Sequence, residues 1–433
     1  MRTITIFIFF LGVLMADILP KHFSSTLKNG LEVVVIPMNN GSNVITTDIF
    51  YKVGSRNEVM GKSGIAHMLE HLNFKSTKNL KAGEFDEIVK SYGGINNAST
   101  GFDYTHYFIK SSSQNLDNSL KLFSELMQNL NLLDEEFQPE RMVVAEERRW
   151  RTDNSPIGFM YFTMFNNAFI YHPYHWTPIG FIDDILNWKI EDIKEFHKRY
   201  YQPKNAIIVV AGDVEPELVF EHAKKYFESI PNDGDIPLVY QKEPEQNGEK
   251  RAIIKKESEV EVVAIAYKIP NFQHIDQTAL SAISEILSGG KSSRLQKVLV
   301  DEKRVANQVY AYNLELIDAG VFIIMAVCNP NFKAEEVEKL ILQEIKKIKK
   351  DITSEEVEKT KINAKADFIF SLENSSNVAD LYGSYLARGD INPLLTHLDR
   401  LNALSAKDIQ NVAKKYFKKQ NSTTVILRKK SKE

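Results

Sequence analysis

The chain alternates between short apolar segments typical of β-strands and longer segments in which apolar residues recur with helical spacing. Residues 31–36, 45–50 and 260–267 are rich in β-branched residues and have the length of strands. In each half, such segments come first and long amphipathic segments follow, for example residues 335–348, whose lysines are expected to be solvated. This order predicts an α+β fold in which helices flank a sheet in each half.

The length of 433 residues is too great for one hydrophobic core and fits two domains of about 200 residues. Between residues 230 and 251 the chain contains few bulky apolar residues and two clusters of Pro, Gly, Asn, Asp and Glu, which is typical of a hinge. We therefore predict a first domain over residues 17–232, a linker over residues 233–250 and a second domain over residues 251–433. Laid over each other, the two halves look like a diverged internal duplication.

The first residues are predicted to be a targeting segment. Met1 and Arg2 give a short basic start, residues 4–15 are apolar, and Ala16 precedes the polar Asp17. This pattern is typical of a secretory signal peptide over residues 1–16, with an uncleaved anchor as the alternative, and it predicts a periplasmic or otherwise exported protein. No other apolar run approaches the roughly 18 residues of a membrane span, so we expect no stable span in the mature protein.

Charge and cysteine content exclude two classes of protein. The net charge is −3 and the Lys and Arg residues are dispersed, so no surface for nucleic acid is expected. Cys328 is the only cysteine and cannot form an internal disulfide, which excludes a disulfide scaffold.

The most informative motif is the run from His67 to His71, which reads H-x-x-E-H. In a helix, His67, Glu70 and His71 project from one face within about 100° of arc. Two neutral imidazoles can bind Zn²⁺, and a carboxylate beside them can deprotonate a metal-bound water whose pKa is lowered to about 7. The neighbouring apolar residues predict a helix that is buried on one side and lines a cleft on the other. A solvent-facing polar helix is the alternative.

A catalytic zinc ion usually has three protein ligands and a water, so a third ligand is required. A second helical pattern runs from Pro139, which we place in the first turn. Glu140 and Glu147 are seven positions apart on this helix and share a face. Glu146 points about 100° away and is predicted to be a solvated charge.

With these motifs the chain resembles the inverzincin zinc peptidases, a family that includes pitrilysin, insulin-degrading enzyme and the mitochondrial processing peptidase. It is most similar to the short bacterial members with two domains. The family has H-x-x-E-H followed by a ligand Glu at a characteristic distance, and 75 residues lie between His71 and Glu147 here. Further similar segments are residues 64–67, 93–100 and 172–180.

The resemblance implies that His67, His71 and Glu147 bind Zn²⁺, that Glu70 is the general base, and that Glu140 supports the site. It also implies two homologous domains, each an antiparallel sheet flanked by helices, which form a clamshell on dimerisation. The implied activity is a zinc-dependent endopeptidase that hydrolyses unfolded peptides or short protein segments. Two alternatives are a non-catalytic scaffold or partner subunit of the same fold, and a metal-dependent hydrolase of another fold.

Asn97-Ala98-Ser99-Thr100 and the alternating aromatic residues up to Phe108 predict an exposed edge strand near the site. In the similar enzymes this strand pairs with the substrate backbone, so Asn97 and Ala98 are predicted to bind the peptide by β-augmentation. An ordinary hairpin is the alternative. Four further histidines have no partner at ligand spacing and are predicted to be structural or on the surface: His106, His172, His175 and His197.

One departure from the family concerns the groups that hold the substrate carbonyl and its developing oxyanion. Family members that work alone carry an Arg and a Tyr seven positions apart in the second half, where this chain has Val300 and Asn307. Arg304 and Tyr310 lie nearby but are six positions apart. In two-chain members a zinc-less partner supplies the pair. The resemblance therefore implies a related zinc-less subunit as partner, with a homodimer as the alternative.

Overall fold

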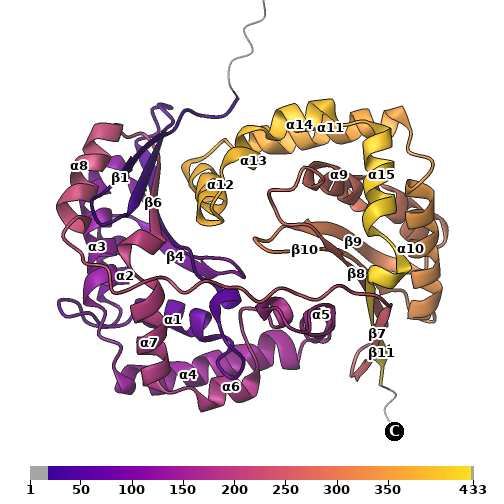
Figure 1. The fold of residues 1–433 in the computed structure, drawn as a ribbon, viewed down its shortest axis with the longest axis horizontal. Helices are drawn as coiled ribbons and strands as arrows, with labels where there is room; N and C mark the ends of the chain where they lie inside the picture. Colours follow the sequence, from indigo (N-terminus) through magenta and orange to yellow (C-terminus); the bar gives the residue numbers. More distant parts are fainter. Residues whose placement is uncertain (1–17, 431–433) are drawn as a thin grey trace, which may run out of the picture.

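The computed structural model describes residues 18–430, so the predicted signal peptide lies outside the described residues. Two sheets, one from each half of the chain, lie side by side with helices around and between them (Figure 1). The predicted α+β fold with helices flanking a sheet in each half is confirmed. Between residues 18 and 430, no helix combines the length and the apolar character needed to cross a membrane.

The elements of the first half are β1 (Phe23–Thr26), β2 (Glu32–Pro37), β3 (Val44–Tyr51), α1 (Ile65–Asn73), α2 (Glu84–Ser91), β4 (Ile95–Thr100), β5 (Thr105–Ser112), α3 (Leu116–Asn129), α4 (Asp134–Arg148), α5 (Pro156–Ala168), α6 (Ile182–Asn187), α7 (Ile190–Tyr200), β6 (Ala206–Gly212) and α8 (Pro216–Phe227). Those of the second half are β7 (Lys250–Lys256), β8 (Val262–Ile269), α9 (Gln277–Ser288), β9 (Ala306–Leu314), β10 (Gly320–Cys328), α10 (Ala334–Ile348), α11 (Ser354–Phe370), α12 (Ser375–Ala387), α13 (Asn392–Leu395), α14 (His397–Ala403), α15 (Ala406–Tyr416) and β11 (Ser422–Lys429).

The two sheets share one topology. The first has the order β1-β2-β6-β3-β5-β4 and the second β7-β11-β8-β10-β9, so that they match strand for strand once β1 is set aside. Each sheet contains one parallel pair, β2–β6 in the first sheet and β7–β11 in the second, and the remaining pairs are antiparallel. The parallel pairs were not part of the prediction. They arise because the last strand of each half returns, after several helices, beside a strand from its start.

Each half covers one face of the other half's sheet with a helix. One face of the first sheet packs on helices of its own half, but the opposite face, with Phe50 and Val209, contacts Val378 and Tyr382 of α12. In the same way, one face of the second sheet packs against α5, where Phe165 is buried. Figure 1 shows α12 beside β6 and α5 beside β11. The two halves are therefore interlocked.

The close approach of α12 to the first sheet depends on Gly383. A Cβ atom at this position would lie 2.0 Å from Cε2 of Phe50, which is far inside van der Waals contact. Only glycine lets the helix pack this closely on strand β3.

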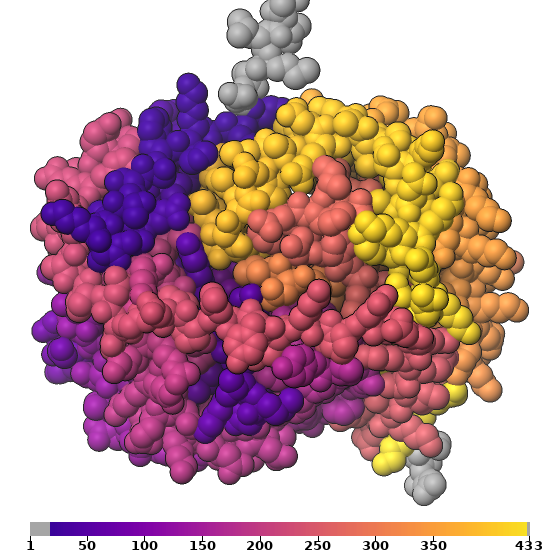
Figure 2. Space-filling model, viewed as in Figure 1, coloured from indigo at the N-terminus to yellow at the C-terminus, as the bar shows by residue number. Residues whose placement is uncertain are grey.

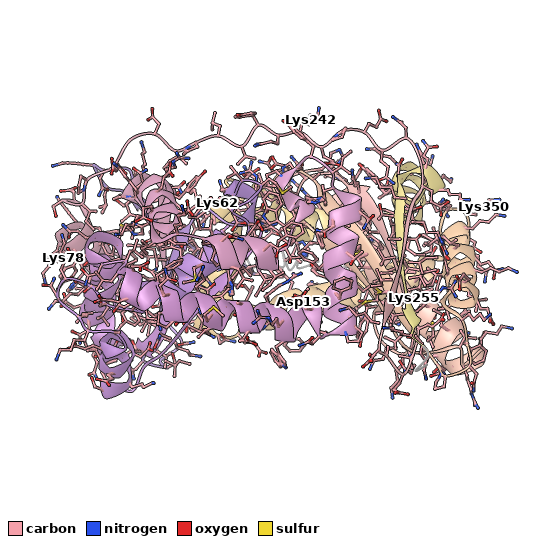
Figure 3. All side chains as sticks on the ribbon, turned by 90° about the horizontal axis from the view of Figure 1, so that it is seen from below. Lys62, Lys78, Asp153, Lys242, Lys255 and Lys350 are labelled. Carbon is pink, nitrogen blue, oxygen red and sulfur yellow. The ribbon has the colours of Figure 1, made fainter. Side chains whose placement is uncertain are left out.

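Residues 230–249 contain no helix or strand and connect α8 to β7 across the face shown in Figure 2. Lys242 marks this linker along one edge of the molecule in Figure 3. The nearly buried carboxylate of Glu243 accepts hydrogen bonds from the backbone N–H groups of residues 170–172 and lies 2.7 Å from Nζ of Lys268. A buried charge is stable only when it is paired and hydrogen-bonded. Glu243 finds these partners in residues 170–172 of the first half and in Lys268 of the second half, so it fixes the linker to both halves.

Candidate metal centre

A buried carboxylate holds the N-terminus of helix α1 in place. The first N–H groups of this helix have no partner within it, and the buried carboxylate of Glu58 accepts hydrogen bonds from the backbone N–H groups of Gly64 and Ala66 at 2.8 and 2.9 Å. The indole N–H of Trp176 donates to the same carboxylate at 2.7 Å. Burial raises the pKa of Glu58 to about 8, although these three donors favour the carboxylate. Glu58 thereby fixes the start of the helix that carries the H-x-x-E-H motif.

Two glycines allow the loop before α6 to lie against the start of α1. Gly64 has φ 84°, and a Cβ atom there would lie 2.6 Å from the carbonyl oxygen of Ile179. Gly180 has φ 75°, and its Cβ would lie 2.5 Å from the carbonyl carbon of Ser63. Both glycines belong to the segments that carry the family resemblance, and the contact places residues 177–179 at the edge of the site.

The structure brings His67, His71 and Glu147 together. The Nε2 atom of His67 lies 3.7 Å from Oε2 of Glu147, and Nε2 of His71 lies 3.4 Å from the same oxygen. One candidate ligand atom from each residue can be chosen so that all three lie within 4.8 Å of one another. Two imidazoles and one carboxylate are a ligand set of catalytic zinc sites. The residues present therefore fit a zinc ion.

Glu140 holds one of the two imidazoles. Its Oε1 atom accepts a hydrogen bond from Nδ1 of His71 at 2.7 Å, and its Oε2 atom lies 2.7 Å from Nζ of Lys75. When neutral His71 carries its proton on Nδ1, the lone pair on Nε2 points toward Glu147. Metal-binding histidines usually donate one ring N–H to a carboxylate in this way and bind the metal through the other nitrogen. Nδ1 of His67 is buried and makes no hydrogen bond within residues 18–430.

The two histidines differ in their protonation. Burial lowers the pKa of His67 to about 4. Burial also disfavours a charged His71, but its contacts with Glu140 and Glu147 prevail and raise its pKa to about 9. Because a metal ligand must be a neutral imidazole, binding a cation here would release a proton from His71.

Glu70 lies on the same side of α1 and is held by the edge strand of the first sheet. The hydroxyl of Thr100 on β4 donates a hydrogen bond to Oε2 of Glu70. Burial raises the pKa of Glu70 above its usual value. Glu146, in contrast, has a side chain that is 67% exposed and pairs with Arg149.

Glu70 and the three candidate ligands, His67, His71 and Glu147, line one cavity of about 740 Å³. Residues 97–100 of β4 form one part of its wall, and Arg151, Tyr161 and residues 177–179 line it as well. Arg151 and Tyr161 were missed at the sequence level, although Arg151 follows Glu147 by four positions and so shares its helix face.

Strand β4 is the free edge of the first sheet, next to the internal strand β5. The exposed N–H of Ala98 donates to Oδ1 of Asn97 at 2.9 Å, within its own strand. The aromatic segment that was predicted together with this edge forms β5, where His106 is buried between neighbouring strands.

Helix α4 begins earlier than predicted. It starts at Asp134, so that Pro139 lies inside it and the three acidic residues 134–136 form its first turn. A proline inside a helix removes one backbone hydrogen bond. The seven-residue spacing of Glu140 and Glu147 is unaffected, and both side chains contact histidines or Lys75 of the α1 region.

The positions compared with the family's Arg and Tyr lie away from the cavity. Val300 packs on the core of the second half. Asn307 is exposed on β9, and Tyr310 on the same strand donates its hydroxyl to Gln308. Arg304 adopts φ 52° in the turn before β9. No residue between 250 and 430 lines the cavity that contains His67 and Glu70.

The remaining predicted histidines are structural groups. His106 lies 3.1 Å from buried Asp48, and His172 lies 2.9 Å from Asp318 of the second half. His175 binds a backbone carbonyl through Nδ1. Burial lowers the pKa of His197 to about 4.

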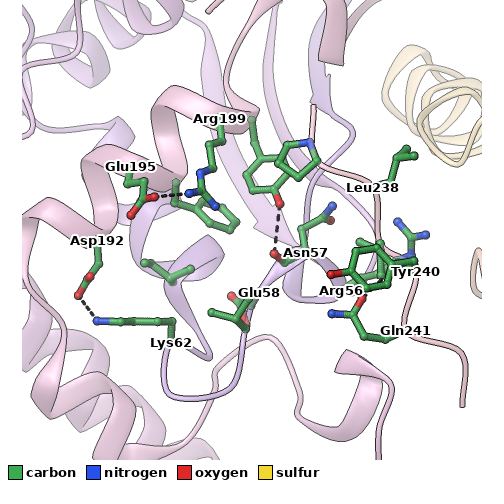
Figure 4. A pocket seen from close by; sticks show the side chains of 16 residues that line it. Arg56, Asn57, Glu58, Lys62, Asp192, Glu195, Arg199, Leu238, Tyr240 and Gln241 are labelled. Atoms are coloured by element: carbon green, nitrogen blue, oxygen red, sulfur yellow. Dashed lines mark hydrogen bonds and ion pairs between the residues drawn. The ribbon is translucent and has the colours of Figure 1, made fainter. Parts of the chain in front are cut away.

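A second cavity, of about 460 Å³, lies between α7 and the linker (Figure 4). Its charged groups largely pair with one another, as in the contacts Lys62–Asp192 and Glu195–Arg199. Leu238 and Tyr240 of the linker lie at its opposite side. It contains no cluster of metal-binding side chains among the described residues.

Known proteins confirm the family. The model for insulinase (peptidase family M16) matches residues 33–166, and the model for the peptidase M16 inactive domain matches residues 187–364. The chain is 58% identical over 414 residues to the zinc protease PqqE of Helicobacter pylori, covering 95% of this chain and 93% of that protein. It is 26% identical to the probable mitochondrial-processing peptidase subunit beta of Arabidopsis thaliana, covering 92% of this chain and 76% of that protein.

A solved structure agrees with these relatives. The crystal structure of a protease from Helicobacter pylori superimposes with a TM-score of 0.93 at 58% identity, covering 95% of this chain and all of that chain. The chain therefore belongs to peptidase family M16. The resemblance drawn from its motifs is confirmed, and so are the two homologous α+β domains.

Proposed function

We propose that this protein is a zinc-dependent endopeptidase that hydrolyses unfolded peptides or short protein segments. The observation that carries the proposal is the convergence of His67, His71 and Glu147 beside Glu70 in one cavity. The names of the relatives, which include zinc proteases, support it.

Each side chain of the site has a defined task in this proposal. Zn²⁺ held by His67, His71 and Glu147 would supply a Lewis acid that lowers the pKa of a bound water and polarises a peptide carbonyl. Glu70 accepts a proton from the attacking water and returns it to the leaving amine. Burial raises its pKa toward the working pH, which favours both transfers, and the Thr100 hydroxyl keeps the carboxylate in place.

The substrate is proposed to lie along β4. An extended peptide that pairs with this free edge would form main-chain hydrogen bonds whatever its side chains, which favours unfolded substrates of many sequences. The N–H of Ala98 is available for such a bond once the Asn97 side chain releases it. Asn97 and Ala98 are therefore the proposed substrate-binding residues.

The site lacks donors from the second half, because no residue from 250 to 430 lines the cavity. We propose that a related subunit without zinc closes over it as a clamshell and supplies an Arg and a Tyr. A homodimer is the second candidate. The apolar N-terminal segment also leads us to propose that the protein is exported to the periplasm.

The test uses the purified full chain and a fluorogenic unstructured peptide. Cleavage should require about one Zn²⁺ per chain, stop when a chelator removes the metal, and return when zinc is added back. A chain that binds no zinc, or one that cleaves the peptide equally well after chelation, would contradict the proposal. Full zinc occupancy without cleavage, with or without candidate partner subunits, would favour a non-catalytic scaffold.

A further inference from the structure

Among residues 18–430, Arg151 is the only Lys or Arg that lines the cavity of the candidate site. It lies in the turn Arg149–Asp153 that follows α4. Its Nη1 atom is 2.8 Å from Oε1 of Glu147, while Oε2 of the same carboxylate faces the two imidazoles. Lys75 also lies near the site, but it pairs with Glu140 at 2.7 Å and does not line this cavity. Arg151 is therefore the cation that faces the same cavity as Glu70 and the three candidate ligands.

The guanidinium of Arg151 has unused hydrogen-bonding capacity. Its side chain is 61% exposed, and within residues 18–430 it makes one ion pair and no geometrically regular hydrogen bond. An arginine carries five N–H donors in a planar fork. Most of these donors remain available to a molecule that enters the cavity.

The backbone at Arg151 is held in place by a close contact with α5. A Cβ atom on Gly158 would lie 2.0 Å from the carbonyl oxygen of Arg151, so the glycine allows the turn to press against this helix. The position from which the side chain extends is thus fixed, while its charged end lies at the cavity.

We propose that Arg151 binds a carboxylate of the substrate, so that peptides with an acidic group near the scissile bond are preferred. The proposal rests on the proposed peptidase function and names its substrate class. A guanidinium matches the geometry of a carboxylate and binds it through two parallel hydrogen bonds. The carboxylate can be an Asp or Glu side chain or the C-terminus of a short peptide.

A purely structural role for Arg151, as a partner that orients Glu147, gives a different expectation. In that case, removing the guanidinium would change zinc affinity and the cleavage of all peptides to the same extent. Selection between peptides of different charge would remain as it was.

The first experiment measures binding without turnover. In the Glu70→Gln protein, the fluorescence anisotropy of labelled peptides that differ only by Asp, Asn or Lys at one position is recorded with and without zinc. We expect the Asp peptide to bind about two- to fivefold more tightly than the Asn peptide, a size typical of an exposed charge pair, and the Lys peptide to bind more weakly than both. Arg151→Ala should abolish this preference and Arg151→Glu should reverse it.

Arg149→Ala is the matched control. Arg149 lies in the same turn and pairs with Glu146, but it does not line the cavity, so this variant should keep the preference. Pairs of peptides with a free or an amidated C-terminus separate the two sources of the carboxylate. An Arg151→Ala protein that retains the full preference, or a native site without any preference, would overturn the inference.

The second experiment separates this inference from the proposed function. Zinc-loaded protein with an otherwise native site is assayed for kcat/KM on the same peptides, alone and with any partner. If it cleaves them all at equal rates, the carboxylate proposal fails and the peptidase proposal stands. If it cleaves none of them while fully loaded, the peptidase proposal fails, and with it the substrate class inferred here.

Discussion

The two halves of the chain share one topology but differ in chemistry. In each half, a helix lies against the edge strand of the sheet: α1 against β4 in the first half and α9 against β9 in the second. Helix α1 carries His67, Glu70 and His71. In the second half, Gln277 and Ser281 of α9 instead accept hydrogen bonds from the Asn313 amide of β9. The difference shows that the fold provides a place for a site, whereas a few side chains decide the activity.

The halves also differ in what they leave uncovered. The edge strand β4 of the first half lines a large cavity, whereas no residue of the second half up to residue 430 lines it. Since α5 and α12 are exchanged between the sheets, the two halves cannot separate without exposing both apolar faces. Closure over a substrate is therefore expected to come from another chain rather than from opening within this one.

The largest expected effect is that of Glu70→Gln. The amide cannot accept the proton of the water, so peptide hydrolysis should fall by about 10²–10⁴-fold, while zinc content stays near the native level. A control change on α9 of the second half, Ser284→Ala, should leave hydrolysis unchanged. Metal analysis and peptide cleavage measure both variants. Loss of zinc from the Glu70→Gln protein would show that Glu70 has another role.

The next effect concerns the missing donors of the second half. Losing one oxyanion donor typically costs about 10²–10³ in rate, so the isolated chain should be a weak peptidase that a partner with the Arg and Tyr pair accelerates by about this factor. The assay compares the chain alone, at micromolar concentration, with the reconstituted complex. Equal rates would end the heteromer proposal.

Glu147 and Glu146 test the assignment of the third ligand. Glu147→Gln should weaken zinc binding by about 10²-fold or more, because even partners outside the ligand set typically contribute 10–100-fold. Glu146→Gln should be nearly silent, since its side chain points to solvent. Zinc titration with a competing chelator measures both. If the two variants behaved alike, Glu147 would not be the ligand.

Much of the site could be predicted from the sequence because helical geometry is regular. The spacing of His67, Glu70 and His71, and the spacing of Glu140 and Glu147, each define one helix face whatever the rest of the fold does. The two-domain α+β organisation followed from the order of strand and helix patterns.

The remaining features depend on contacts between distant segments. The periodicity of α5 or α12 shows that a helix has an apolar face, but not which sheet it covers. The start of α4 was placed too late, because Pro139 resembles a first-turn residue, although the five residues before it include the three acidic residues that form the actual first turn. Arg151 was overlooked since its importance depends on the cavity beside it.

The interlocking of the halves predicts the effect of Gly383→Ala. The added Cβ would meet Phe50 at 2.0 Å, and overpacking of this kind costs about 1–3 kcal/mol, against about 1 kcal/mol gained from helix propensity. The net loss in the free energy of unfolding is therefore expected to be at most about 2 kcal/mol, with one cooperative transition in calorimetry. Asn377→Ala, on the exposed face of α12, is the control. Two separate transitions would mean that the halves fold independently.

The smallest expected effect lies at the junction of the two halves, where Asp318 contacts Arg56 and His172. Burial works in the opposite direction, but these partners hold the pKa of Asp318 at about 2, below its usual 3.8. A carboxyl group whose pKa is lower in the folded than in the unfolded chain stabilises the fold at pH values above its unfolded pKa. This contribution is lost as the pH falls from about 4 toward 2. Because the side chain is about one third exposed, solvent screening limits this contribution to less than about 1 kcal/mol.

Asp318→Asn should therefore be less stable than the native chain near pH 6 and equally stable near pH 2. Denaturant unfolding across this range measures the difference, with the exposed Asp301→Asn as control. A difference that is the same at every pH would show that Asp318 joins the halves by shape rather than by charge.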